Sequence, residues 1–149
     1  MVAEAAAILD RAAVPFVAGH RADSAVQKKG NDFATEVDLA LERQIGADLT
    51  SATGIGVHGE EFGGADLDAP LVWVLDPIDG TTNFLAGRPF FGTLIALLAD
   101  GFPVLGIIDQ PILGERWVGV AGKPTTLNGR DVRARRCPSC SRRRRETSS

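Results

Sequence analysis

An apolar run that ends in acidic residues constrains the fold of this chain more than any other feature. Residues 71–75 (Leu-Val-Trp-Val-Leu) contain no polar side chain, which is typical of a short β-strand with both faces buried. The sequence Asp-Pro-Ile-Asp-Gly-Thr-Thr follows directly at residues 76–82. A buried strand that ends in two carboxylates, Asp76 and Asp79, places both of them near one edge of a sheet. We therefore expect a sheet with an acidic edge.

Two segments before residue 54 have the pattern of helices. Residues 2–17 are rich in alanine, and a second helix is predicted from Thr35 onwards. The apolar positions of the second helix recur every four residues, at Val37, Leu41, Ile45 and Leu49. This stripe predicts that Glu42 lies on the surface. Thr35 and Asp38 also fit the N-cap and the acidic partner of a capping box, which would give Asp38 a purely structural role.

Strands are predicted in the rest of the chain, at residues 55–58, 71–75, 92–99, 103–108 and 116–121. Asp100-Gly101 indicates a tight hairpin between two of them, and residues 127–130 indicate another turn. Helices followed by hairpin-linked strands predict an α+β fold, with two N-terminal helices packed on a mainly antiparallel sheet.

The acidic residues around the central strand are candidate metal ligands. Asp76 and Asp79 would repel each other unless a cation lay between them, and oxygen ligands favour a hard ion such as Mg²⁺. Glu60-Glu61 would add carboxylates at the end of a second strand, and Gly80-Thr81-Thr82 could present backbone N–H groups to a phosphate. Two alternatives stay open: Asp76 to Gly80 could be no more than two successive turns, and the Glu pair could be a solvated corner.

Charge is distributed unevenly along the chain. Residues 1–132 hold nine basic and eighteen acidic residues, a net charge of −9, whereas residues 133–145 hold seven of the sixteen basic residues. An acidic body suits cation binding and argues against nucleic acid as a partner, except through the Arg-rich tail. We interpret residues 133–149 as a disordered tail produced by truncation or a shifted reading frame. No apolar stretch is long enough for a membrane, and no secretory signal is visible, so we expect a cytoplasmic protein.

Three motifs together resemble the inositol monophosphatase family. They are Asp-Phe-Ala-Thr-Glu-Val-Asp at 32–38, Gly-Glu-Glu at 59–61, and Asp-Pro-Ile-Asp-Gly-Thr-Thr-Asn-Phe at 76–84. The resemblance covers about residues 3–132. It implies that residues 1–132 form the N-terminal metal- and phosphate-binding domain of the family, which is the first half of its layered α/β sugar-phosphatase-like fold.

The resemblance also implies a role for each acidic residue of these motifs. Glu60, Asp76 and the carbonyl of Ile78 would hold a first Mg²⁺, and Asp76 and Asp79 would hold a second. The residues expected to bind the substrate phosphate are Gly80, Thr81 and Thr82. The hydroxyl of Thr81, polarised by Asp38, would help to activate the attacking water.

The resemblance implies hydrolysis of a small phosphorylated metabolite, but its parts favour different substrates. Residues 20–64 and 81–84 are similar to inositol monophosphatases, whereas residues 91–117 are more similar to histidinol-phosphate phosphatases. We favour inositol 1-phosphate, with histidinol phosphate as the alternative. A further alternative is a non-catalytic truncated domain, because the Trp-Asp motif of the family's second half is absent from the sequence. Exposed sheet edges in such a domain would favour a homodimer.

Overall fold

The computed structural model describes the backbone of residues 1–20, 25–27 and 33–133. Side chains are described for residues 1–20 and 36–133. The Arg-rich tail lies outside the described residues from residue 134 on. The side chain of Thr35 also lies outside them, so its predicted N-cap role stays a prediction. No helix in the described ranges combines the length and the apolar composition needed to cross a bilayer.

Three helices are present among the described residues: α1 (Val2–Gly19), α2 (Glu36–Thr53) and the short α3 (Thr81–Leu85). The two long helices confirm the sequence prediction, although α1 continues past Pro15 to Gly19. The prediction for Glu42 was wrong. Its side chain is only 5% exposed, on the buried face of α2 beside Leu41 and Ile45.

Within the described parts of the chain, the strands form a two-stranded ribbon and an eight-stranded sheet. The ribbon consists of β1 (Ala25–Gln27) and β2 (Phe33–Thr35). The strands of the large sheet are, in chain order, β3 (Val57–Gly59), β4 (Gly63–Gly64), β5 (Leu71–Asp79), β6 (Gly92–Ala99), β7 (Phe102–Gln110), β8 (Glu115–Val120), β9 (Thr126–Leu127) and β10 (Arg130–Asp131). Their spatial order is β10-β9-β8-β7-β6-β5-β3-β4.

The large sheet is mixed but mainly antiparallel, as predicted. From β5 to β10 each strand pairs antiparallel with the next, and β3 pairs parallel with β5. The hairpin predicted at Asp100-Gly101 is present, with φ of 48° and 77° at its two central residues. These positive angles are those of a type I′ turn, which matches the twist of the flanking strands. The chain thus runs through β6 and β7 as the sequence indicates.

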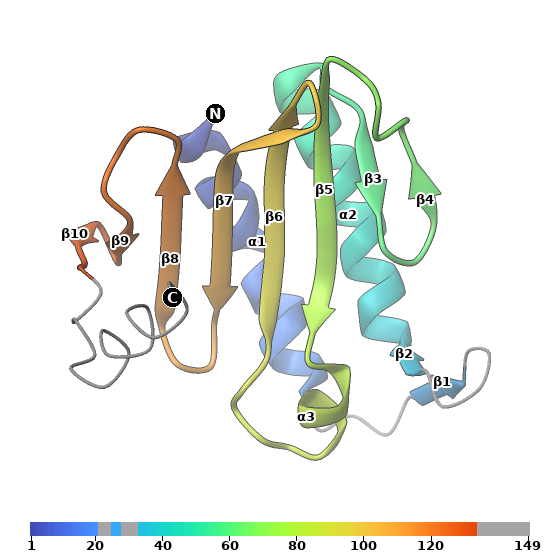
Figure 1. Ribbon diagram of the computed structural model, residues 1–149. Helices are drawn as coiled ribbons and strands as arrows, with labels where there is room; N and C mark the ends of the chain where they lie inside the picture. Colours follow the sequence, from blue (N-terminus) through green and yellow to red (C-terminus); the bar gives the residue numbers. More distant parts are fainter. Residues whose placement is uncertain (21–24, 28–32, 134–149) are drawn as a thin grey trace, which may run out of the picture.

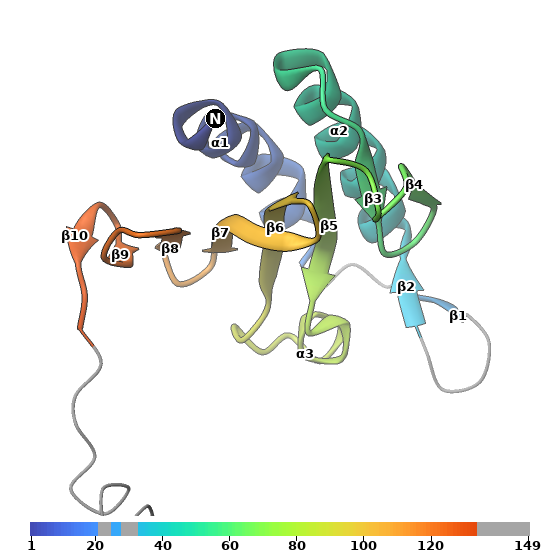
Figure 2. The same cartoon turned by 45° about the horizontal axis from the view of Figure 1, so that its top comes forward.

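Both long helices cover the same face of the sheet (Figures 1 and 2). The core between these layers includes Phe16 from α1, Ile45 from α2 and Trp73 from β5. On the opposite face Val72 is buried, but Val74 is only partly buried. The expectation that β5 is buried on both faces is therefore only partly correct, because no helix lies over this part of the opposite face in the described chain.

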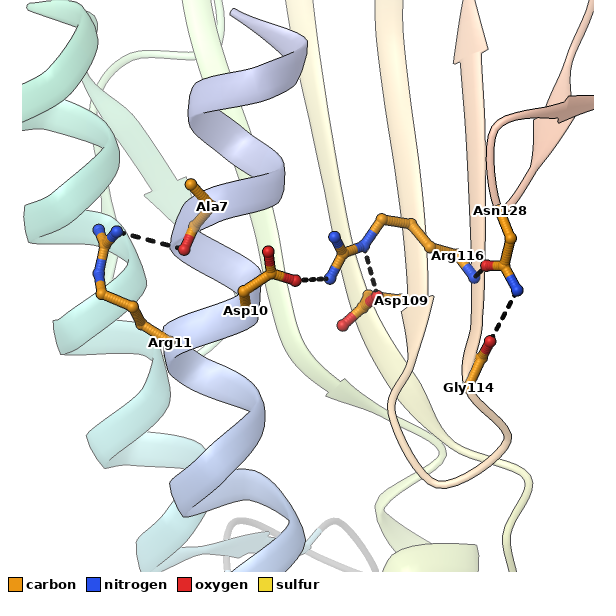
Figure 3. Close-up of polar contacts among 7 residues, drawn as sticks. All are labelled: Ala7, Asp10, Arg11, Asp109, Gly114, Arg116 and Asn128. Atoms are coloured by element: carbon orange, nitrogen blue, oxygen red, sulfur yellow. Dashed lines mark hydrogen bonds and ion pairs between the residues drawn. The ribbon is translucent and has the colours of Figure 1, made fainter.

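An arginine on β8 ties α1 to the sheet (Figure 3). Arg116 Nε donates a hydrogen bond to Asp109 Oδ1 at 2.7 Å, and Arg116 Nη2 donates to Asp10 Oδ1 at 2.8 Å. The backbone N–H of Arg116 donates to Asn128, whose amide donates in turn to the carbonyl of Gly114. Burial lowers the pKa of Arg116, but its bonds to Asp109 and Asp10 outweigh burial and raise it. We call Arg116, Asp109 and Asp10 the arginine cluster.

Candidate active site

The parallel pairing of β3 and β5 brings two acidic segments to one edge of the sheet. Gly59 lies opposite Leu75, so Glu60 and Asp76 are the residues that follow at the same level. The backbone N–H of Glu60 donates to the carbonyl of Leu75 at 3.0 Å, and the Glu60 side chain is hydrogen-bonded to Asp76. The prediction that acids gather at the ends of neighbouring strands is thus confirmed for this pair.

The end of β5 is shaped by an irregularity and a tight turn. The pairing register with β6 shifts between Asp76 and Asp79, and the hydroxyl of Thr93 donates to the carbonyl of Pro77 at 2.8 Å across this interruption. Gly80 then turns the chain with φ of 88°, where an added Cβ would lie 3.0 Å from the carbonyl oxygen of Phe90. Only glycine fits this turn easily. It leads directly into α3, which lies below the end of β5 in Figure 1.

Asp38 adds a third element to the acidic edge. It lies in the first turn of α2 and is only 2% exposed. Burial, Glu60, Asp79 and Asp38 together raise the pKa of Asp76 to about 8. We call Glu60, Asp76, Asp79 and Asp38 the acidic corner. They come from the ends of β3, β5 and α2, and the other three raise the pKa of Asp76.

The acidic corner fits a hard divalent cation in its chemistry. Asp76 Oδ1 is buried and has no hydrogen-bond partner among the described residues, and a cation would satisfy it and relieve the repulsion around it. As they stand, no three described His, Cys, Asp or Glu side chains form a ready-made metal cage. Mg²⁺ does not require one, because it keeps several waters and binds through one or two carboxylates together with substrate phosphate.

The segment that follows the acidic corner has the polarity expected of an anion site. The hydroxyl of Thr81 donates to the carbonyl of Ile78 at 3.0 Å. The carbonyl of Gly80 accepts the first helical bonds, from the N–H groups of Asn83 at 2.8 Å and Phe84 at 3.1 Å. The N–H groups at the start of a helix have no acceptor within that helix, and here they belong to Thr81 and the exposed Thr82.

Two residues that support this site were not anticipated from the sequence. Glu42 accepts hydrogen bonds from the backbone N–H groups of Glu61 and Phe62, and Thr93 holds the carbonyl of Pro77. A signal for Glu42 did exist, because it lies one helical turn after Asp38 and therefore on the same face of α2. No comparable signal marks Thr93, whose partner depends on the pairing of β5 with β6.

The comparison with known sequences decides the family. A profile described as the inositol monophosphatase family matches residues 1–149. The chain belongs to the inositol monophosphatase family. It is 64% identical over 130 residues to the inositol-1-monophosphatase ImpA of Mycolicibacterium smegmatis, a match that covers 87% of this chain and 47% of the relative. It is 43% identical over 90 residues to a histidinol-phosphatase of Mycobacterium tuberculosis, covering 60% of this chain and 35% of that protein.

Solved structures of the inositol monophosphatase family share the fold. An inositol monophosphatase from Zymomonas mobilis superimposes with a TM-score of 0.76 at 42% identity, covering 92% of this chain and 53% of the other. The two helices on a mixed, mainly antiparallel sheet are therefore the family arrangement. This chain spans about half the length of the inositol monophosphatase relatives that it matches.

Proposed function

We propose that this chain provides the divalent-metal and phosphate-binding part of a phosphatase that hydrolyses a small phosphate monoester. The observation that carries the proposal is the acidic corner. The charged groups among the described residues that shift the pKa of Asp76 are Glu60, Asp79 and Asp38, all carboxylates. A cluster of this kind at the exposed end of a sheet is suited to a cation that comes from solution.

We assign the cation ligands to the ends of β3 and β5. Glu60 and Asp76 with the carbonyl of Ile78 would hold one Mg²⁺, and Asp76 with Asp79 would hold a second. When bound, such ions lower the pKa of a water molecule and neutralise charge that develops on a phosphate. The hydrogen bond between the Thr81 hydroxyl and Ile78 supports the assignment, because it fixes the orientation of that carbonyl.

The residues after β5 would bind and orient the phosphate. The backbone N–H groups of Gly80 and Thr81, together with Thr82, would donate to its oxygens. The Thr81 proton is engaged with the Ile78 carbonyl, so the Thr81 oxygen can accept a hydrogen bond from the attacking water. We assign to Asp38 the stabilisation of the proton that this water loses. In the reaction, a bond forms between the water oxygen and phosphorus. The bond from phosphorus to the alcohol oxygen breaks, and the alcohol leaves with a proton.

Inositol 1-phosphate is the substrate that we favour. The 64% identity to a protein named inositol-1-monophosphatase supports it over the 43% identity to a histidinol-phosphatase. Histidinol phosphate is the second candidate, supported by that relative and by residues 91–117. Three further predictions from the sequence stay predictions: that the chain forms a homodimer, that it is cytoplasmic, and that residues 1–132 form one domain.

The test combines binding with turnover. Calorimetry with Mg²⁺, and phosphate release from inositol 1-phosphate and from histidinol phosphate, are measured for the wild-type chain and for Asp79→Asn. Asp109→Asn is the matched control, because it makes the same change in the arginine cluster. We expect Asp79→Asn to weaken Mg²⁺ binding and to abolish any release, whereas Asp109→Asn keeps both. Equal Mg²⁺ binding by wild type and Asp79→Asn would contradict the proposal.

A further inference from the structure

Glu42 is a charged residue in a core position. It lies in the middle of α2 and is 5% exposed, on the face that also carries Leu41, Ile45 and Leu49. Burying a carboxylate is costly unless hydrogen bonds replace its water. A glutamate in such a position therefore indicates that its contacts do something that an apolar residue could not.

Both oxygens of the Glu42 carboxylate bind the same turn. Oε2 accepts a hydrogen bond from the backbone N–H of Glu61 at 2.8 Å, and Oε1 accepts one from the backbone N–H of Phe62 at 2.9 Å. Hydrogen bonds to an ionised acceptor are stronger than those between neutral groups. The turn between β3 and β4 is thus bound to α2 through a pair of bonds from one side chain.

Glu60 lies between two fixed points as a result. Its own N–H donates to the carbonyl of Leu75 on β5 at 3.0 Å, and the next N–H along the chain, that of Glu61, donates to Glu42. These two hydrogen bonds fix the backbone on either side of the Glu60 Cα, and so they fix the position from which the Glu60 side chain extends. From there it reaches Asp76.

Gly59 is part of the same arrangement. A Cβ added at Gly59 would collide with the Glu42 carboxylate, both its oxygen and its carbon. The absence of a side chain at Gly59 therefore allows Glu42 to lie directly against the backbone of the turn. Gly59 leaves room for the Glu42 carboxylate, and Glu61 donates a backbone hydrogen bond to it, so the residues on both sides of Glu60 contact Glu42.

We infer that Glu42 is a positioning residue that aims Glu60 at the cation site through the backbone of the β3–β4 turn. The inference rests on the proposed function, because it needs Glu60 to be a metal ligand. Residues that orient metal ligands without touching the metal change metal affinity by about 10- to 100-fold when replaced. A residue that only stabilised the fold would lower stability and leave the affinity of the folded protein unchanged.

Glu42→Gln is the discriminating variant. Glutamine has the same shape, but it has one acceptor oxygen and an NH₂ group that would face the N–H of Glu61 or Phe62. One of the two bonds is therefore lost while the volume is kept. Asp109→Asn is the matched control: it makes the same acid-to-amide change at another buried, hydrogen-bonded side chain, outside the acidic corner.

The measurement is the Kd for Mn²⁺, by electron paramagnetic resonance of the free ion, for the folded chain and three variants. We expect about a tenfold weaker Kd in Glu42→Gln, an unchanged Kd in Asp109→Asn, and a weaker one in Asp79→Asn. If Asp79→Asn weakens binding and Glu42→Gln does not, the role of Glu42 is overturned alone. If Asp79→Asn binds like wild type, the proposed metal site fails and the role of Glu42 falls with it.

A second measurement needs no variant and covers the case in which Glu42→Gln does not fold. Addition of Mg²⁺ to the wild-type chain should shift the amide proton resonances of Glu61 and Phe62, although neither amide is a metal ligand. The two shifts should saturate together with those of Asp76 and Asp79. Unchanged Glu61 and Phe62 resonances at saturating Mg²⁺ would overturn the inference.

Discussion

The acidic corner and the arginine cluster are two groups of charged residues beside the large sheet, each with one buried aspartate, Asp38 and Asp109 respectively, and their charges are balanced differently. In the arginine cluster Asp109 is 6% exposed and receives a hydrogen bond from Arg116, which also binds Asp10 (Figure 3). At the acidic corner, the described residues that act on Asp76 are other carboxylates. One cluster has its cation within the chain, and the other is suited to a cation from solution.

The protonation of the two clusters reflects this difference. The bonds to two carboxylates raise the pKa of Arg116, so its charge is secured. Burial and like charges instead raise the pKa of Asp76 to about 8, so this carboxyl group favours its neutral form at pH 7. The ion pairs of the arginine cluster stabilise the fold, whereas repulsion among neighbouring acids at the acidic corner costs stability and suits the corner to a cation.

Removal of the positive charge of Arg116 should have the largest effect on the free energy of unfolding. Arg116→Met leaves Asp109 buried without its partner, and we expect a loss of about 3 kcal/mol in the free energy of unfolding. Urea denaturation measures it. Because the arginine cluster shares no residue with the acidic corner, the loss should be the same with and without Mg²⁺.

Arg11→Met is the control for this prediction. Arg11 pairs with Asp48 at 3.0 Å, but its side chain is 57% exposed, so its removal should cost less than about 1 kcal/mol. A similar loss in both variants would show that burial does not distinguish the two ion pairs.

At the acidic corner, removal of an acidic side chain should increase the free energy of unfolding instead of lowering it. Asp76→Asn removes one of the repelling carboxylates, so the metal-free chain should become more stable by about 1 kcal/mol. The same variant should lose the rise in Tm that Mg²⁺ gives to the wild-type chain. Thermal unfolding with and without Mg²⁺ tests both parts, and a destabilised variant that still responds to Mg²⁺ would contradict the comparison.

The smallest effect is expected at the rim of the arginine cluster. The Asp10 side chain is 68% exposed, so its pair with Arg116 is screened by solvent. Asp10→Asn should therefore change the free energy of unfolding by about 0.5 kcal/mol or less. Urea denaturation of this variant and of Asp109→Asn, for which a larger loss of stability is expected, shows whether burial determines the strength of each of the two ion pairs of Arg116.

Local patterns predicted much of the fold. The strand at residues 92–99 and the Asp100-Gly101 turn agree with the structure because the pattern and the turn chemistry lie within a few residues. The grouping of Glu60 with Asp76 was also predictable, since each follows a predicted strand, although β5 continues through Asp76 to Asp79. The parallel pairing that sets them level depends on the register of β3 against β5, which no short segment encodes.

Residues that bind distant partners were missed for a physical reason. A glutamate at position 42 fits a solvent-facing helix position, and its burial becomes favourable only because amides 19 and 20 residues away bind it. Arg116 and Asp10 are 106 residues apart in sequence, so their contact exists only after the sheet and α1 have packed. Arg116 and Asp10 therefore carry no local sequence signal of their contact, and the spacing of Glu42 from Asp38 shows only which face of α2 it shares, not which amides bind it.

Paramagnetic broadening by Mn²⁺ tests the central claim most directly. In NMR spectra of the wild-type chain, small additions of Mn²⁺ should broaden the amide resonances of Glu60, Glu61 and residues 76–81 first. The resonances of Asp10, Asp109 and Arg116 should stay sharp at the same ratio of metal to protein. Broadening that begins at the arginine cluster, or that spreads evenly over the chain, would contradict the assignment of the acidic corner as the cation site.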